Sequence, residues 1–446
     1  MNGQTELRKN GMSTSDSSHD LAVQSGPHAR FRFGEWPEIS PAEALTQLQQ
    51  TGKLSRVRVA RLKLEGEFDR PLEFSEVELD KPDIRKAMFR EPVTFAKCQL
   101  QGLAFSRGPV IFEKSLTFKS CAFRRTRFDC IKVLGTLHLD RSEFANTTRF
   151  NRCELGGIHC WETHFAAWAQ FDDCTFAAGA QADFRSLQSD EGMIFKGCQF
   201  LGDVLFRGAV FAKKLDLGES QVNGLLDLSK AKLHDYCYLE GIVPGAQQQF
   251  AFLNTVAERI LVHPRQVQGR LQSEETGHFD QAMQEYGLLK ANFQTLHRFD
   301  EEDWALYRFK VNQRRAKPRN WWRPWTRLAQ LSDWVLLDLG CGYGTKPSRA
   351  VGTALLMMVC FAAIYAAGIH HFDIEKPPIA DLPTDHFANR VLFGLLTTVS
   401  VFTSGFGGDQ LHAAHGWMLV PLAIEALLGT LLWGLFIVAF SRKVIR

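Results

Sequence analysis

The sequence predicts a multidomain protein in which a repetitive β-structure, a helical hairpin and an α-helical two-span membrane domain follow one another along the chain. Between about residues 74 and 240, large apolar residues recur at alternating steps of five and six. Apolar residues then adopt a helical spacing between residues 279 and 311, and two long apolar runs fill 350–369 and 417–440. Neither a helix nor a strand has a period of five to six, whereas a fixed longer period indicates stacked repeats.

Composition narrows the classes of protein that fit. The 446 residues are enough for two or three domains, and the formal net charge is only +3, so nothing global suggests nucleic-acid binding. The polar, Ser-rich start contains no cleavable signal, and we expect residues 1–30 to be disordered. Ten cysteines are scattered without a CxxC pair, so we expect them to be reduced. Residues 31–73 would lead into the repeat.

Two columns of residues define the repeat. Its clearest run of large apolar centres is Phe195, Phe200, Phe206, Phe211, Leu217, Val222, Leu228 and Leu233. Two residues before many centres lies a small residue: Cys98, Cys121, Ser142, Cys153, Cys174, Cys198, Ala209, Ser220 and Ala231. A narrow coil has room for one bulky and one small inward side chain per face. We therefore expect most of the cysteines in the core.

This pattern resembles the pentapeptide-repeat family, in which Ala, Cys or Ser stands two residues before a central Phe or Leu. The resemblance implies a right-handed quadrilateral β-helix over residues 74–245, with roughly 22 residues per coil and about eight coils. Residues 184–195 interrupt the spacing. Some family members mimic DNA with an acidic exterior, but residues 74–240 hold as many Lys and Arg as Asp and Glu. A spacer or docking scaffold fits better.

A zinc site is the main alternative for the Cys and His residues of the repeat. Cys153, His159, Cys160 and His164 are the usual ligand types and lie close in sequence. Their spacing matches no known site type, and Cys153 belongs to the small column of the core. We therefore predict neither a metal site nor a cofactor.

The next segment, 246–318, reads as a linker and a helical hairpin. Asp300–Glu302 would cap the second helix and Pro318 would end it. Such a hairpin would close the open edge of the β-helix. Residues 319–348 follow as an amphipathic interfacial helix and a turn. This helix interleaves Trp with Arg, as membrane-interface helices do: Trp321, Trp322, Trp325 and Trp334 alternate with Arg319, Arg323 and Arg327.

Residues 349–446 are predicted to form a membrane domain with spans at 350–371 and 416–440. Each apolar run has about the 20 residues that are needed to cross a bilayer. Basic residues flank the two spans on the side of the chain ends: Lys346, Arg349, Arg442, Lys443 and Arg446. The loop between the spans is mostly acidic. By the positive-inside rule, both termini and the β-helix are expected in the cytoplasm.

The motif "LDLGCGYGTKP", residues 337–347, has three interpretations. A methyltransferase cofactor loop would need a following helix and, about 20 residues on, an acidic residue for the ribose. Here a membrane span follows, and the first acidic residue is Asp373 on its far side. A channel filter would lie between two spans and not before the first. We therefore expect a turn that joins the interfacial helix to the first span.

The loop between the spans contains the candidate site. Residues 388–402 are apolar and predict a re-entrant pore helix. Residues 403–409 follow as Thr403, Ser404, Gly405, Phe406, Gly407, Gly408 and Asp409. Irregular backbone at membrane depth occurs only where it is buried in protein or lines a wet cavity. Glycines allow successive carbonyls to point the same way, and rings of carbonyls replace an ion's hydration shell.

This order of elements resembles the two-span potassium-channel family, whose filter reads Thr-Val-Gly-Tyr/Phe-Gly-Asp. The resemblance implies that the carbonyls of residues 403–407 bind cations in a homotetramer, with the Thr403 hydroxyl at the innermost site. Ser404 replaces the family's Val and Gly408 is an insertion at the outer mouth before Asp409, so selectivity for potassium and nonselective cation conduction both stay open. Gly429 lies where the family often has its gating hinge. Glu425 would either face the cavity or brace the pore helix.

Together the two resemblances match a class of bacterial membrane proteins identified as ion channels. They imply a multi-pass protein of the inner (cytoplasmic) membrane, a tetrameric cation channel. Its repeat domain would serve sensing, docking or assembly and would bind a cytoplasmic protein partner. The alternative is a membrane-tethered scaffold in which the pore-like segment only holds subunits together. We expect no enzyme, since no nucleophile, base or metal set emerges, and no nucleic-acid partner.

Overall fold

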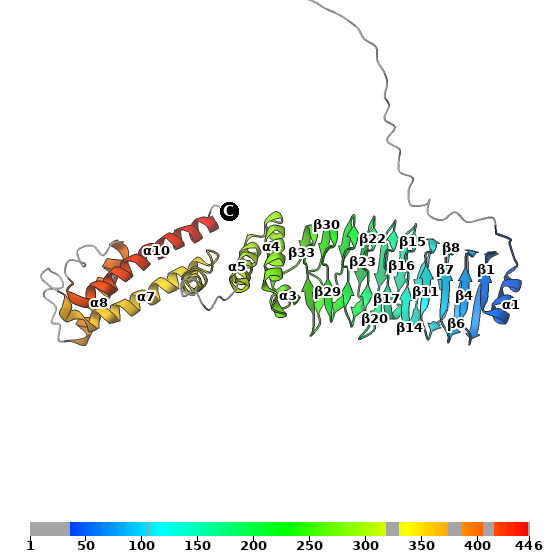
Figure 1. The fold of residues 1–446 in the computed structure, drawn as a ribbon, viewed down its shortest axis with the longest axis horizontal. Helices are drawn as coiled ribbons and strands as arrows, with labels where there is room; N and C mark the ends of the chain where they lie inside the picture. The colour runs from blue at the N-terminus through cyan, green and yellow to red at the C-terminus, as the bar shows by residue number, and fades with distance from the viewer. Residues whose placement is uncertain (1–35, 106–107, 318–329, 373–385, 405–413, 445–446) are drawn as a thin grey trace, which may run out of the picture.

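The computed structural model describes residues 36–105, 108–317, 330–372, 386–404 and 414–444. They form an elongated molecule in which a β-solenoid, a layer of two helices and a helical bundle follow in chain order (Figure 1). The N-terminal segment 1–30, for which the sequence predicts disorder, lies outside these residues.

The strands are short, parallel and stacked along the solenoid (Figure 1). In the first third they are β1 (Lys53–Ser55), β2 (Arg58–Ala60), β3 (Lys63–Phe68), β4 (Leu72–Ser75), β5 (Glu78–Asp80), β6 (Asp83–Phe89), β7 (Val93–Ala96), β8 (Gln99–Gln101), β9 (Ala104–Phe105), β10 (Val110–Phe112) and β11 (Leu116–Lys119). In the middle they are β12 (Ala122–Arg124), β13 (Arg127–Asp129), β14 (Ile131–His138), β15 (Glu143–Phe144), β16 (Thr148–Asn151), β17 (Glu154–His159), β18 (His164–Phe165), β19 (Ala169–Asp172), β20 (Thr175–Phe176), β21 (Ala182–Asp183) and β22 (Gln188–Ser189). In the last third they are β23 (Gly192–Lys196), β24 (Gln199–Phe200), β25 (Val204–Leu205), β26 (Val210–Phe211), β27 (Lys214–Asp216), β28 (Gln221–Val222), β29 (Leu225–Asp227), β30 (Lys232–Tyr238), β31 (Val243–Pro244), β32 (Gln249–Ala251) and β33 (Val256–Leu261).

One ladder of paired residues measures the repeat. Its successive partners are Lys53, Glu73, Thr94, Thr117, His138, His159, Asp183, Leu205, Asp227 and Ala251. These nine pairings average 22 residues per turn, which confirms the stacked repeat and its predicted period. The strands extend beyond the predicted range of 74–245 at both ends, from Lys53 to Leu261, so the solenoid has about nine turns where the sequence predicts eight. The four-sided, right-handed form stays a prediction.

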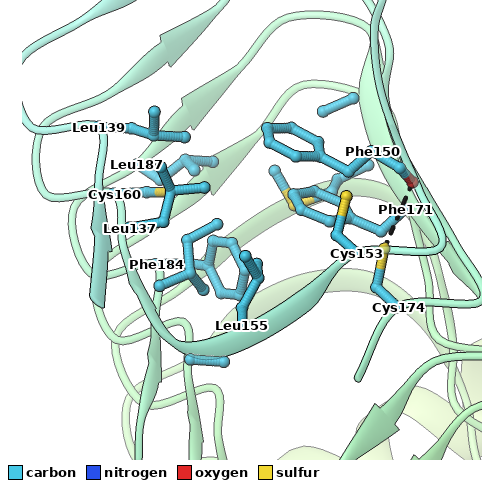
Figure 2. Close-up of a cluster of buried hydrophobic side chains, with 14 of the residues drawn as sticks. Leu137, Leu139, Phe150, Cys153, Leu155, Cys160, Phe171, Cys174, Phe184 and Leu187 are labelled. Carbon is cyan, nitrogen blue, oxygen red and sulfur yellow. Dashed lines mark hydrogen bonds between the residues drawn. The ribbon is translucent and has the colours of Figure 1, made fainter. Parts of the chain in front are cut away.

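Stacked phenylalanines fill the core. The rings of Phe128, Phe150 and Phe171 lie one above the other, with centroids 4.5 and 4.3 Å apart. Such pairs contribute roughly 0.5–1.5 kcal/mol each beyond the area they bury. Figure 2 shows Phe150 and Phe171 beside Cys153 and Cys174, all turned into the interior. The repeat therefore buries its aromatic residues in continuous stacks.

The small column predicted from the sequence is confirmed, and the structure adds a reason for its chemistry. The thiol of Cys174 donates a hydrogen bond of 3.4 Å to the carbonyl of Phe150 on the preceding turn (Figure 2). Ser142 and Ser220 donate in the same way to Phe118 and Phe195, at 3.3 and 3.1 Å. A small side chain that carries a donor can therefore fill the space and also bond the turn below.

Helices close both ends of the solenoid. At the start, α1 (Pro41–Thr51) buries Ala44 and Leu48 against the first turn. At the other end, α2 (Pro264–Val267) and α3 (Gln272–Glu275) lead into α4 (Phe279–Thr295), which packs against α5 (Phe299–Ala316). Asn292 of α4 accepts a hydrogen bond from the Ile260 amide at 2.7 Å and donates one to the Ile260 carbonyl at 2.8 Å. The Asn292 side chain thus satisfies both backbone groups of Ile260 at the strand edge that the last turn would otherwise leave open.

The remaining described residues form a helical bundle beyond α5 (Figure 1). They comprise η2 (Asp333–Leu339, a π-helix), α7 (Pro347–Ala367), η3 (Ile369–His371), α8 (Phe387–Ser404), η4 (Gly416–Met418) and α10 (Leu419–Val444). Trp321, Trp322 and Trp325 of the predicted interfacial helix lie outside the described residues, whereas Trp334 is exposed on η2.

Candidate functional site

Two helices are long and apolar enough to cross a membrane. Pro347–Ala367 has 21 residues and Gly416–Val444 has 29, and each contains a window of mean hydropathy 2.1. A helix of 21 residues spans roughly 30 Å, the thickness of a bilayer's hydrocarbon. Large apolar side chains also face outward, such as Leu356 at 65% and Leu427 at 69% exposure. An apolar exterior is costly in water but typical of a helix in lipid.

A shorter helix, α8, packs against both of these helices. It approaches α7 closely at Gly394, where a Cβ atom would lie 2.2 Å from the carbonyl oxygen of Ala362. No side chain fits in that space. Small residues at such crossings are typical of helix packing in membranes.

Glu425 of α10 joins the three helices through its buried carboxyl group. The hydroxyl of Tyr365 on α7 donates to Glu425 Oε2 at 2.5 Å, and the hydroxyl of Thr398 on α8 donates to Oε1. All three side chains are fully buried. The Glu425 carboxyl group thus holds the short helix against both long ones, and its role in a pore stays a prediction.

Gly429 of α10 faces the end of α8. A Cβ atom there would lie 3.1 Å from Cδ2 of Phe402, whereas the same test at Gly434 meets nothing within 4 Å. Gly429 therefore has a packing reason to be glycine, because it leaves room for the Phe402 ring. Its role as a gating hinge stays a prediction.

The predicted filter lies only partly within the described residues. The sequence predicts a pore helix over 388–402, and α8 extends from Phe387 to Ser404. Thr403 and Ser404 thus end the helix instead of belonging to the extended segment, and the Thr403 hydroxyl donates to the Val399 carbonyl of its own helix at 2.7 Å. Gly405, Phe406, Gly407, Gly408 and Asp409 fall outside the described residues. The ion-binding role of 403–407 stays a prediction.

The glycine-rich motif at 337–347 lies where the sequence places it, at the junction between the solenoid cap and α7. Residues 342–345 form a turn in which Gly342 and Gly344 have φ of 56° and 77°. Asp338 binds α5, accepting from the Tyr307 hydroxyl at 2.8 Å and pairing with Arg314 at 2.7 Å. Burial raises the pKa of Tyr343, beside Arg314, to about 12. The motif is therefore an anchored turn.

The end of α10 also contacts α5, the outer helix of the cap at this end of the solenoid. Arg442 pairs with Asp303 at 3.2 Å and with Glu302 at 3.5 Å, and Lys443 lies 3.7 Å from Asp300. Asp300 and Glu302 lie in the first turn of α5, where acidic residues interact favourably with the helix dipole, but no side-chain hydrogen bond caps this helix. Arg349 of α7 lies over the ring of Tyr307 on α5, 5.6 Å from its centroid, so both long helices of the bundle contact α5.

The zinc ligands weighed from the sequence do not come together. Cys153 and Cys160 are buried in the solenoid core, and His164 pairs with Asp190 at 2.9 Å. His159, one of those four residues, converges instead with His138 and Asp140. Sequence reasoning missed it because the two histidines come from successive turns.

No protein-family model matches the chain, and no curated protein matches it either. Its architecture therefore defines its class: a β-solenoid of about nine turns joined to two helices long and apolar enough to cross a membrane.

Proposed function

We propose that the chain is one subunit of a tetrameric cation channel whose solenoid is a cytoplasmic sensing, docking or assembly domain. The observation that carries the proposal is the Glu425 brace. It holds α8, whose last two residues are the Thr and Ser of the Thr-Ser-Gly-Phe-Gly segment, against two helices of membrane length. A short apolar helix fixed between two spans is the arrangement that a re-entrant pore requires.

The chemistry of 403–409 favours a cation. Backbone carbonyls of a glycine-containing segment can replace a cation's hydration shell. The C-terminal end of α8 forms the first two residues of this segment, and the partial negative charge of a helix C-terminus attracts cations. We expect a homotetramer because one chain supplies only a fraction of a carbonyl ring.

The proposed channel could be selective for potassium or could conduct cations without selectivity. Potassium conduction requires that Ser404 and Gly408 leave the spacing of the carbonyl rings intact. A nonselective cation channel results if Ser404 or the extra glycine widens the filter. Conduction in either form requires no cofactor, and the permeant cation is the ligand of the filter.

The charges at the junction support the proposed orientation. Arg442 and Lys443 lie at the end of α10 that contacts the cap helix α5, and Lys346 and Arg349 flank the start of α7. Positive residues favour the cytoplasmic side. The solenoid and both chain ends would then lie in the cytoplasm of a bacterium, beneath its inner membrane.

A membrane-tethered scaffold is the second candidate, because the solenoid offers a long surface for a protein partner. Potassium flux from liposomes separates the two. Wild-type protein should release potassium, a Gly405→Ala/Gly407→Ala variant should not, and Gly352→Ala, where a methyl group meets nothing within 4 Å, should behave as wild type. Tetramers that pass no ion under any potential or pH would support the scaffold.

A further inference from the structure

Two histidines and an aspartate meet on the outer surface of the solenoid. His138 ends β14 and His159 ends β17, and the two are register partners on neighbouring turns. Asp140 follows His138 by two residues. One ligand atom from each of the three side chains lies within 4.8 Å of the others. The side chains are between 24% and 33% exposed, so an ion and water can reach them.

We propose that His138, Asp140 and His159 bind a divalent transition-metal ion. Imidazole nitrogen and carboxylate oxygen are preferred ligands of Zn²⁺ and its neighbours, and three protein ligands leave one position open for water or another ligand. Bonds of about 2.0 Å in a tetrahedron place ligand atoms roughly 3.3 Å apart. Asp140 Oδ1 lies 2.5 Å from His159 Nδ1, and Asp140 Oδ2 lies 3.7 Å from His138 Nδ1, so one distance is shorter and the other longer than that separation. Small side-chain rotations would complete the site.

The far side of His159 supports this assignment. Its Nε2 lies 3.1 Å from Oδ2 of Asp183, whose side chain is only 4% exposed. Asp183 in turn is held by Arg185 at 2.7 Å. A metal-binding histidine commonly donates its second N–H to a carboxylate, which orients the ring and raises its basicity. Asp183 occupies that position while Nδ1 of His159 faces Asp140 and His138.

The charges around the cluster suit a cation. Asp140 supplies a carboxylate beside the two imidazole rings. Arg185 neutralises Asp183 and not Asp140. Without a metal, His159 bridges Asp140 and Asp183. The experiment therefore has to distinguish metal binding from this bridge alone.

The cluster lies on the solenoid, outside the proposed pore, so metal binding there does not depend on ion conduction. A bound ion would join two successive turns at one point. It would also leave an exposed coordination position on the surface that we propose as a docking domain.

The test is cobalt binding by the full-length protein in detergent after removal of metals with a chelator. The chain holds 14 His and 10 Cys, and some of them could bind cobalt elsewhere. The readout is therefore the number of bound cobalt equivalents that is lost when residues of the cluster are substituted. Wild type should bind one equivalent with visible d–d absorption that Zn²⁺ abolishes, and His138→Gln/His159→Gln should lose it. His164→Gln, outside the cluster, should retain it.

Asp183→Asn provides a second variant that leaves all three ligands in place. It should weaken binding by roughly 10–100-fold. This graded loss keeps the proposal testable even if the double variant fails to fold. Equal numbers of bound equivalents in wild type and the folded double variant, or no cobalt bound by wild type at micromolar concentrations, would overturn the site.

Discussion

The hydroxyl of Tyr365 donates a hydrogen bond of 2.5 Å to the carboxyl group of Glu425, and the structure buries both side chains completely. The two residues are 60 positions apart, on α7 and α10, and Thr398 of α8 donates to the other oxygen of the same group. A buried polar group that loses its partner is costly, so a network of this kind specifies one arrangement of its helices. The position of α8 follows from it.

Substitution of this network should loosen α8. We expect Glu425→Ala to destabilise the bundle by about 1–3 kcal/mol, because it leaves two buried hydroxyls without their acceptor. Tyr365→Phe should cost less, since the carboxyl group keeps Thr398. A double-mutant cycle on Tyr365 and Glu425, measured by unfolding in detergent, should give a coupling of roughly 0.6–1.7 kcal/mol. Ile424→Ala, a half-exposed neighbour, is the control, and a coupling of zero would show that the brace is not formed.

Gly429 and Gly434 form a matched pair on α10. Alanine raises helix propensity by about 1 kcal/mol at either position, but only at Gly429 does a Cβ atom press on Phe402. Gly434→Ala should therefore leave stability unchanged or increase it, and Gly429→Ala should be less stable than Gly434→Ala by about 1–3 kcal/mol. Thermal unfolding of both variants measures the difference. If the two variants behave alike, Phe402 does not pack on Gly429, and the hinge becomes the better reason for the glycine.

Arg442 should hold the end of α10 against α5. Removal of its side chain in Arg442→Ala should increase hydrogen exchange in the first turn of α5 and the last turn of α10, because Asp303 and Glu302 lose their shared partner. Global stability should also fall, by about 1–3 kcal/mol, because the Glu302 and Asp303 side chains are only 4% and 14% exposed and a buried charge that loses a partner is costly.

Lys443→Ala serves as the control for this variant. Its partner, Asp300, is 88% exposed and contributes little. Exchange that rises equally in both variants would mean that the Arg442 pair does not fix this junction.

The small column of the solenoid tolerates a donor but not bulk. Cys174→Ser should be close to neutral, since Ser142 and Ser220 occupy equivalent positions and donate in the same way. Cys174→Val should destabilise the solenoid by about 1–3 kcal/mol, because it overfills the space and leaves the Phe150 carbonyl without the thiol. Denaturant unfolding compares the two variants. Equal stability would show that neither the donor nor the volume matters there.

The solenoid was predictable because its signal is local. Phe171 and Cys174 stand three residues apart, and the same spacing recurs through the repeat. The first turns were missed because Leu54, Val59 and Leu64 occupy their centres, and aliphatic residues in steps of five do not stand out as phenylalanines do.

Contacts between turns and between helices were not predictable. Paired positions on the ladder are 20 residues apart at Lys53 and Glu73 but 24 apart at His159 and Asp183. A mean period of 22 therefore cannot place His138 beside His159. Glu425 likewise meets Tyr365 and Thr398 across long separations that leave no periodic trace. The only sequence signal for the burial of Glu425 was that it is a lone carboxylate in an apolar run.

The most direct test of the central claim is recording from the purified protein in a planar bilayer, first with unequal KCl on the two sides and then with potassium facing sodium. We predict unitary currents that reverse near the potassium equilibrium potential in the KCl gradient, which shows cation selectivity, and that are absent in Gly405→Ala/Gly407→Ala protein that still assembles. With potassium facing sodium, a reversal potential far from zero would establish potassium selectivity, and one near zero a nonselective cation channel. Correctly assembled wild-type tetramers that give no unitary current, or currents unaffected by the filter substitutions, would contradict the account.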